Sequence, residues 1–432
     1  MTLKIPKSET QPTVDLDYHS RLFRYVRLIV NCISVLTFRP VPLPESPTYT
    51  SNDVTIILPT IAGDDKEEEL RNTILSCLQC MPFEMIIVTI EKNRERAETI
   101  ARQIDEKRIK VRCVAQANKR RQMCRAIPEV NTRITIFADD DVIWPPTLLH
   151  WILAPFEDKD VGGVGTSQRL RRESYPSVWN FLGACYLERR NFDIAACTHV
   201  DGGLPCLSGR TVAYRTHILQ EAEFTYGFQN ETWRSFQLNA DDDNFITRWM
   251  VTRGWKTYVQ YHKEAEVKTT LESNAAFLKQ CLRWSRSNWR SNMTSLFVEG
   301  HVWWRQPWST YAVQQTTLTA WSIPVDAALL YLCYKATENW ELPYQQLAIL
   351  LQTTWMLGSK FVKIFGHLVR NPEDVLYFPI YIVFGYFHCL IKLYALLTLS
   401  ETAWGSREGA DIDNKYRMMK IRKHQMPPTM KV

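Results

Sequence analysis

Arg133-Ile-Thr-Ile-Phe137-Ala138-Asp139-Asp140-Asp141-Val142 places an apolar run directly before three carboxylates. A short run rich in β-branched residues that ends in polar residues predicts a buried β-strand followed by a loop. Carboxylates at positions i and i+2 of an extended chain point the same way, so Asp139 and Asp141 can share a divalent ion. Oxygen ligands favour Mg²⁺ or Mn²⁺. A solvated acidic turn is the alternative interpretation of the same residues.

Three further strands are predicted earlier in the chain, at residues 54–58, 85–90 and 109–114, and helical patterns alternate with them. This alternation predicts an α/β fold with a mostly parallel sheet and flanking helices, whose ligands bind at the carboxyl ends of the strands. Thr60, Glu91 and Asp139 each follow a strand end, and Lys119 to Ala126 follows the third strand. We therefore expect four strand ends to converge on one crevice.

A second acidic group, Asn239-Ala-Asp241-Asp242-Asp243-Asn244, precedes a predicted helix over residues 245–251. Adjacent carboxylates repel each other, so the pKa of one should rise, which suits a general base. An acidic group at a helix start is also favourable by itself, and a purely structural helix cap is the alternative.

Gln280-Cys-Leu-Arg283-Trp284 places three functional side chains at positions i, i+3 and i+4, on one face of a helix. Arginine offers a planar fork for phosphate, tryptophan a flat platform for a sugar ring, and glutamine both a donor and an acceptor. Further cations on this segment also suit a basic helix at a membrane surface. Lys119-Arg120-Arg121 could hold a diphosphate or could be a solvated basic helix start.

Composition excludes several classes of protein. The 432 residues carry a formal charge of only +6, and the cations are spread along the chain, so we expect no nucleic-acid partner. The eleven cysteines are scattered singly apart from Cys77-Leu-Gln-Cys80, which indicates no disulfide framework and suits a reducing compartment. The polar first twenty residues contain no removable signal peptide.

Apolar stretches near both ends predict contact with a membrane. We expect disorder over residues 1–20, a short transmembrane or interfacial helix and linker over 21–52, and a catalytic domain over 53–273. Interfacial helices should follow over 274–309. Three stretches at 310–334, 343–369 and 376–399 are each long enough to span, within a transmembrane region over 310–400. The alternative is a buried helical domain.

The tail over residues 401–432 is basic, which favours a cytosolic location for it. A catalytic domain in the cytosol then requires an even number of crossings after residue 300. Because three stretches are candidates, we expect one of them to be re-entrant or interfacial.

These motifs together resemble the processive family 2 glycosyltransferases, the group of hyaluronan, chitin and cellulose synthases, and most closely the hyaluronan synthase-like type 2 glycosyltransferases of fungi. The resemblance runs from about residue 54 to residue 407. The matching stretches are Glu91-Lys-Asn93, Asn118 to Met123, Asp139 to Asp141, Val161 to Gln168, Cys206-Leu-Ser-Gly209 through Arg215, Asp241-Asp242, Gln280 to Trp284, and Trp404-Gly-Ser-Arg407.

The resemblance implies a GT-A-like fold with C-terminal transmembrane or interfacial helices, and a membrane-embedded inverting transferase that uses a UDP-sugar and Mg²⁺ or Mn²⁺. Its product would be a β-linked extracellular or cell-wall polysaccharide, plausibly one that supports fungal hyphal growth. The residue roles carried over are metal binding by Asp139 and Asp141; nucleotide and diphosphate binding by Thr60, Glu91, Lys119, Arg120, Asp139, Arg283, Trp404 and Arg407; base catalysis by Asp242 with Asp241; and acceptor binding by Cys206, Ser208, Gly209, Gln280 and Trp284.

Arg210 departs from the family pattern, which has a small residue or proline after Ser-Gly. The N-terminal apolar part is shorter than the usual helix pair, and we expect no channel-closing helices of the family's kind after Trp404-Gly-Ser-Arg407. The alternative enzyme is therefore a non-processive lipid glycosyltransferase similar to ceramide glucosyltransferase, and a catalytically silent scaffold is a third hypothesis. We expect a plasma-membrane protein, with membrane lipids and a glycan or lipid acceptor as partners, and an oligomer of identical chains is possible.

Overall fold

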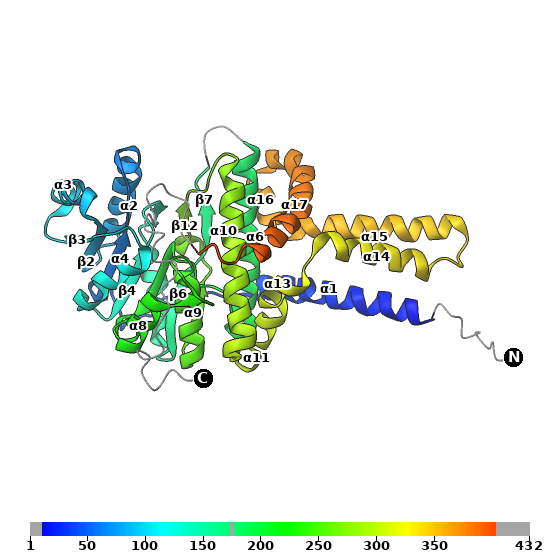
Figure 1. The fold of residues 1–432 in the computed structure, drawn as a ribbon, viewed down its shortest axis with the longest axis horizontal. Helices are drawn as coiled ribbons and strands as arrows, with labels where there is room; N and C mark the ends of the chain where they lie inside the picture. The colour runs from blue at the N-terminus through cyan, green and yellow to red at the C-terminus, as the bar shows by residue number, and fades with distance from the viewer. Residues whose placement is uncertain (1–10, 173–176, 403–432) are drawn as a thin grey trace.

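The computed structural model describes residues 11–172 and 177–402, which form an α/β body and a long helical arm (Figure 1). The body is built on a seven-stranded sheet in which every neighbouring pair is parallel except the two made by β8. In spatial order the strands are β11 (Lys256–Gln260), β6 (Val161–Thr166), β8 (Thr211–Arg215), β4 (Ile134–Ala138), β1 (Val54–Pro59), β2 (Glu84–Ile90) and β3 (Ile109–Val114). The predicted mostly parallel α/β sheet is confirmed.

The central strands β1 and β4 are buried along their whole length because both faces of the sheet are covered by helices. Ile56 and Leu58 of β1 pack in the cluster formed with helices α2 (Glu67–Gln79), α3 (Arg94–Asp105) and α5 (Leu148–Leu153). Ile57, between them, packs on the opposite face with α4 (Lys119–Ala126), α8 (Ala222–Asn230) and α9 (Asp242–Arg253). This two-sided burial fixes the register of β1, and with it the position of Thr60 beyond its end.

A second, three-stranded sheet closes the side of the body next to the acidic residues. It consists of β5 (Val142–Ile143), β12 (Val267–Thr269) and β7 (Gln168–Leu170). β5 begins directly after Asp141, and its antiparallel pairing sets Val142 opposite Thr269. The pairing therefore brings Thr270 beside Asp141, although 129 residues separate them in sequence.

Two long helices join the body to the arm. They are α6 (Val178–Asp201) and α10 (Ala276–Met293), which pack with α16 (Phe365–Arg370) and α17 (Phe378–Leu397) around one apolar cluster. The arm consists of α1 (Gln11–Thr37), α14 (Ser322–Ala336) and α15 (Leu342–Val362), which run away from the body (Figure 1). The prediction of disorder over residues 1–20 is wrong for residues 11–20, which continue the apolar helix toward its N-terminus.

The apolar stretches give fewer continuous spans than the sequence predicts. Among the described residues one helix, Pro372–Leu397, is long and apolar enough to cross a membrane. The first predicted span is broken, since Pro307–Thr319 and Ser322–Ala336 meet at 94° and pass the same test only as a bent pair. α15 is not among the helices that pass, and Lys360 and Lys363 lie at its C-terminal end. Of the three candidate stretches, one therefore passes as a continuous helix and one only as a bent pair, which allows at most two spans among the described residues.

Candidate active site

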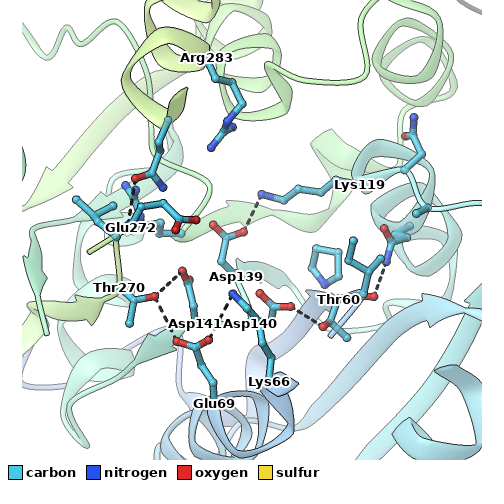
Figure 2. A pocket seen from close by; sticks show the side chains of 18 of the residues that line it. Thr60, Lys66, Glu69, Lys119, Asp139, Asp140, Asp141, Thr270, Glu272 and Arg283 are labelled. Atoms are coloured by element: carbon cyan, nitrogen blue, oxygen red, sulfur yellow. Dashed lines mark hydrogen bonds and ion pairs between the residues drawn. The ribbon is translucent and has the colours of Figure 1, made fainter. Parts of the chain in front are cut away.

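A cavity of about 280 Å³ lies at the carboxyl ends of β1 and β4 (Figure 2). α4, the loop after β12 and α10 complete its walls. Its lining includes Thr60, Lys119, Asp139, Asp140, Asp141, Arg210, Gln280 and Arg283. The predicted convergence of separate strand ends is thus present for the residues that follow β1, β3 and β4, and α10 supplies the opposite wall.

Lys119 connects the two acidic motifs of the sequence. It is the first residue of α4, whose preceding Asn118 caps the helix by accepting a hydrogen bond from Arg121. The Lys119 Nζ lies 2.7 Å from Asp139 Oδ1 and 3.1 Å from Asp242 Oδ2. Burial disfavours the charged amine, but Asp139 and Asp242 outweigh this effect and raise the pKa of Lys119. One fixed ammonium therefore places both carboxylates at the same site.

The three carboxylates after β4 lie in a turn rather than in an extended chain, so the predicted strand-like alternation is wrong. Each finds a different partner (Figure 2). Asp140 accepts a 2.5 Å hydrogen bond from Thr60, and Asp141 accepts one of 3.1 Å from Thr270. Asp139 and Asp141 nevertheless line the same cavity, which is what a shared cation requires.

The three side chains of the Gln280-x-x-Arg283-Trp284 motif on α10 lie in two different environments. Gln280 and Arg283 line the cavity, and Arg283 points into it (Figure 2). Burial and the neighbouring Arg210 lower the pKa of Arg283, whereas the nearby aspartates oppose that shift. Trp284 instead stacks on Tyr186 of α6, with ring centroids 4.7 Å apart. The predicted common helical face exists, but Trp284 is not among the residues that line this cavity.

Arg120 does not face the cavity, and its predicted contact with a diphosphate is wrong. It follows Lys119 by one helical step, which rotates its side chain by about 100° into the core. The guanidinium is buried and donates to the carbonyls of Phe228 and Ala240, and it forms an ion pair with Glu231 at 2.7 Å. Arg120 therefore holds the segment before α9 in place.

Asp241 likewise serves the fold. Its backbone is left-handed, with a φ of 65°, and it precedes the first residue of α9. Arg290 of α10 binds the buried Asp241 carboxylate at 2.7 and 3.0 Å, and Ser287 donates a further hydrogen bond. Burial favours a higher pKa, but these partners hold the pKa of Asp241 below its usual value. The prediction that Asp241 shares the catalytic work of Asp242 is wrong, because the Asp241 carboxylate already accepts hydrogen bonds from Arg290 and Ser287.

The raised pKa that the sequence predicts for an acidic pair falls on Asp243 instead. Burial, and then the neighbouring Asp242, raise the pKa of Asp243, whose carboxylate accepts from the Gly209 amide at 3.3 Å. Cys206 lies close to Asp243 as well. Burial raises the pKa of the Cys206 thiol, and the negative charge of Asp243 raises it further. Cys206, Ser208 and Gly209 thus pass directly beside Asp242 and Asp243, on the predicted acceptor side.

A further predicted nucleotide contact is not brought to the cavity, and two others cannot be placed. Glu91 lies beyond β2 at the same edge of the sheet, but it is exposed and bonded to Arg94 at 2.9 Å. It is not among the lining residues. Trp404 and Arg407 lie outside the described residues.

Comparison with known proteins identifies the family. The family model described as "Glycosyltransferase like family 2" matches residues 52–287, more than half of the chain. The Type 2 glycosyltransferase of Zymoseptoria tritici is 59% identical over 403 residues, which cover 93% of this chain and 85% of that protein. The chain belongs to glycosyltransferase family 2. It is accordingly an enzyme, a glycosyltransferase, as its motifs predict.

Two further similarities place this family 2 glycosyltransferase more broadly. Hyaluronan synthase 1 of Xenopus laevis is 24% identical over 316 residues, covering 70% of this chain and 50% of that protein. The mannosyltransferase PcManGT of Pyrobaculum calidifontis, solved in complex with GDP-Man and Mn²⁺, matches with a TM-score of 0.56 at 14% identity, covering 91% of this chain and all of that one. The latter similarity confirms the predicted GT-A-like fold.

The residues of this glycosyltransferase that could hold a divalent cation are all oxygen donors, which fits Mg²⁺ or Mn²⁺. Within the described ranges no group of three or more His, Cys, Asp or Glu side chains is arranged as a complete metal site. Two acidic side chains that the sequence motifs do not single out, Glu69 and Glu272, line the cavity with Asp139 and Asp141. Glu69 lies on α2 and Glu272 follows β12, and no sequence motif signals either position.

Gly209 offers a test of the close packing at this site. A Cβ at this position would lie 3.2 Å from Lys119 Nζ and 3.4 Å from Asp242 Oδ2. We expect Gly209→Ala to lower kcat by about tenfold through displacement of the Lys119 ammonium, since misplaced catalytic groups cost rate steeply. Turnover and thermal unfolding of the purified enzyme should be measured together. Gly300→Ala, which meets nothing within 4 Å but strains a φ of 70°, is the control in which stability falls and kcat per folded molecule does not.

Proposed function

We propose that this enzyme transfers a sugar from a UDP-sugar to an acceptor hydroxyl with inversion at the anomeric carbon. The observation that carries the proposal is the position of Lys119 between Asp139 and Asp242, in a cavity that Arg283 enters from the opposite wall. A candidate base, a candidate metal-binding carboxylate and two cations thus surround a single space.

In the proposed reaction Asp242 removes the proton of the acceptor hydroxyl, and the acceptor oxygen attacks the anomeric carbon. The bond from that carbon to the diphosphate breaks on the opposite face, so an α-linked donor gives a β-linked product and UDP. Lys119 and Arg283 neutralise the negative charge that develops on the leaving diphosphate. Asp139 and Asp141 would hold Mg²⁺ or Mn²⁺, which when bound supplies further positive charge to the diphosphate.

We also propose that the helical arm lies in a membrane, with the catalytic domain in the cytosol at the plasma membrane. α15 has 21 residues, which corresponds to a length of about 32 Å and is comparable to the hydrocarbon core. Several of its large apolar side chains are at least half exposed, including Leu347, Leu350, Leu351 and Trp355. Contiguous exposed apolar surface of this kind marks a protein or membrane contact.

The proposed product is a β-linked polysaccharide exported from the cell, in keeping with the similarity to hyaluronan synthase 1. The second candidate, addition of one sugar to a lipid, is favoured by a mainly apolar crevice of about 830 Å³ between α1, α14 and α15. Membranes containing the enzyme should be incubated with radiolabelled UDP-glucose, UDP-N-acetylglucosamine or UDP-glucuronate. High-mass labelled product supports polymer synthesis, organic-soluble product supports the lipid acceptor, and no product from any of these donors contradicts the proposal.

Removal of divalent cations is expected to abolish transfer, and Mg²⁺ or Mn²⁺ should restore it. Asp141→Asn should raise the metal concentration for half-maximal activity by about tenfold or more, because one charged oxygen ligand is lost. Titration of metal into EDTA-treated enzyme measures this. Glu98→Gln, an exposed substitution on α3 outside the cavity, is the charge-matched control. Full activity of the wild type in EDTA would contradict a metal role for Asp139 and Asp141.

A further inference from the structure

A second cavity lies among the helices that join the arm to the body, away from the site described above. Its volume is about 270 Å³, and residues of α1, α6, α15 and α17 form most of its wall. Six basic side chains line it: Arg24, Arg27, Arg189, Lys360, Lys363 and Lys392. No Asp or Glu is among the described residues that line it. Such a concentration of cations between largely apolar helices is costly unless something neutralises it.

Two carboxylates behind the wall neutralise part of this charge. Asp326 of α14 forms ion pairs with Arg24 and with Lys360, the latter at 3.3 Å. Asp193 of α6 binds Lys363 at 2.6 and 2.8 Å. Three cations are thus compensated by two carboxylates.

The remaining three cations differ in what they bind. Lys392 donates to the carbonyls of Thr316 and Ala320 at 2.8 and 3.1 Å. Arg27 and Arg189 have no ion pair with any carboxylate within residues 11–172 and 177–402. Arg189 contacts the Tyr186 ring, with its guanidinium 5.5 Å from the centroid. Two guanidinium groups from different helices therefore face one enclosed space without an acidic partner.

We propose that this cavity binds the phosphate-monoester headgroup of a membrane lipid. Guanidinium groups match phosphate oxygens geometrically and stay charged in apolar surroundings. The wall also carries Leu182, Tyr381 and Phe384, which suit the apolar part of such a lipid. Basic pockets between membrane helices are a recurrent form of lipid-headgroup site. The proposal concerns binding alone and does not depend on the transfer chemistry.

The position of the cavity also links it to the active site. Tyr186 lines the second cavity, and its ring stacks on Trp284, one helical position beyond Arg283. A lipid phosphate bound by Arg189 would therefore lie near Tyr186 and, through its ring, near Trp284. Binding of a lipid in the second cavity is expected to restrict the motion of the Tyr186 and Trp284 rings.

Thermal unfolding of the purified full chain in dodecyl maltoside provides the test, with dioctanoyl phosphatidic acid as the probe. We expect a saturable rise of Tm with phosphatidic acid and little rise with dioctanoyl phosphatidylcholine at the same concentration. Arg27→Gln and Arg189→Gln should each weaken the apparent affinity by about tenfold or more, because each removes charge-assisted hydrogen bonds to phosphate. Arg27→Lys and Arg189→Lys, which keep the charge, should stay closer to the wild type.

Arg39→Gln is the matched control, because Arg39 is exposed just beyond α1 and outside the cavity. It should bind phosphatidic acid as the wild type does. Equal affinity of the wild type and both glutamine variants would overturn the proposal. A Tm rise with inorganic phosphate equal to that with phosphatidic acid would show that free phosphate is the ligand, and would overturn the lipid assignment. If a glutamine variant does not fold, the wild type decides the outcome, because a wild-type Tm that does not rise with phosphatidic acid would overturn the proposal.

Discussion

Asp242→Asn is expected to lower kcat by about 10²- to 10⁴-fold, the usual contribution of a positioned general base. Asparagine has nearly the same shape but cannot accept the acceptor proton. UDP affinity should change little, because Lys119 and Arg283 remain in the cavity. Sugar transfer from the preferred donor and calorimetric binding of UDP are the two measurements. Near-normal transfer by this variant would remove Asp242 from the role of base.

Asp243→Asn is the matched control for that experiment. Asp243 is adjacent in sequence and half-buried, and burial together with Asp242 raises its pKa. Its amide can preserve the contact with the Gly209 amide only in one orientation, so we expect a loss of less than tenfold in kcat. A larger loss for Asp243→Asn than for Asp242→Asn would reverse the assignment of the base.

Arg290→Met is expected to lower the free energy of unfolding by about 3–5 kcal/mol, the range for removal of one partner of a buried ion pair. The substitution leaves Asp241 charged and buried, and it also removes donors to the carbonyls of Leu399 and Glu401. Urea unfolding followed by tryptophan fluorescence in detergent measures the change. Arg253→Met, in an exposed pair with Glu223, is the control and should cost no more than about 1 kcal/mol.

The pH dependence of stability provides a second measurement for the same pair. Because the pKa of Asp241 is lowered in the folded state, its stabilising contribution is present above the unfolded pKa of about 3.9 and is lost as the pH falls through the folded value. Arg290→Met should therefore flatten the loss of stability on the acid side. The same acid sensitivity in wild type and variant would contradict a stabilising role for the pair.

The strands and the convergence of their ends could be predicted because they depend on local patterns. Uninterrupted apolar runs such as residues 54–58 signal a sheet covered on both faces, and Asp139 follows one of them by one residue. The position of Lys119 could be predicted for the same reason. These inferences need only the alternation of strands and helices.

The roles of Arg120 and Asp241 could not be predicted in this way. Each is adjacent to a residue that does face the cavity, and a single helical step or a left-handed backbone turns it away. Their partners, Glu231 and Arg290, lie far away in sequence. Thr270 was missed because its position depends on pairing between β5 and β12, strands of only two and three residues. Glu69 was missed because it lies on α2 and comes to the site only through the packing of that helix.

The ammonium that lies between Asp139 and Asp242 imposes a sequence of events on catalysis. While the donor is absent, Lys119 holds Asp242 in an ion pair. A diphosphate entering the cavity would compete for the same ammonium and free Asp242 for the acceptor hydroxyl. The donor is therefore expected to bind before the acceptor, and initial-rate studies should show a compulsory order.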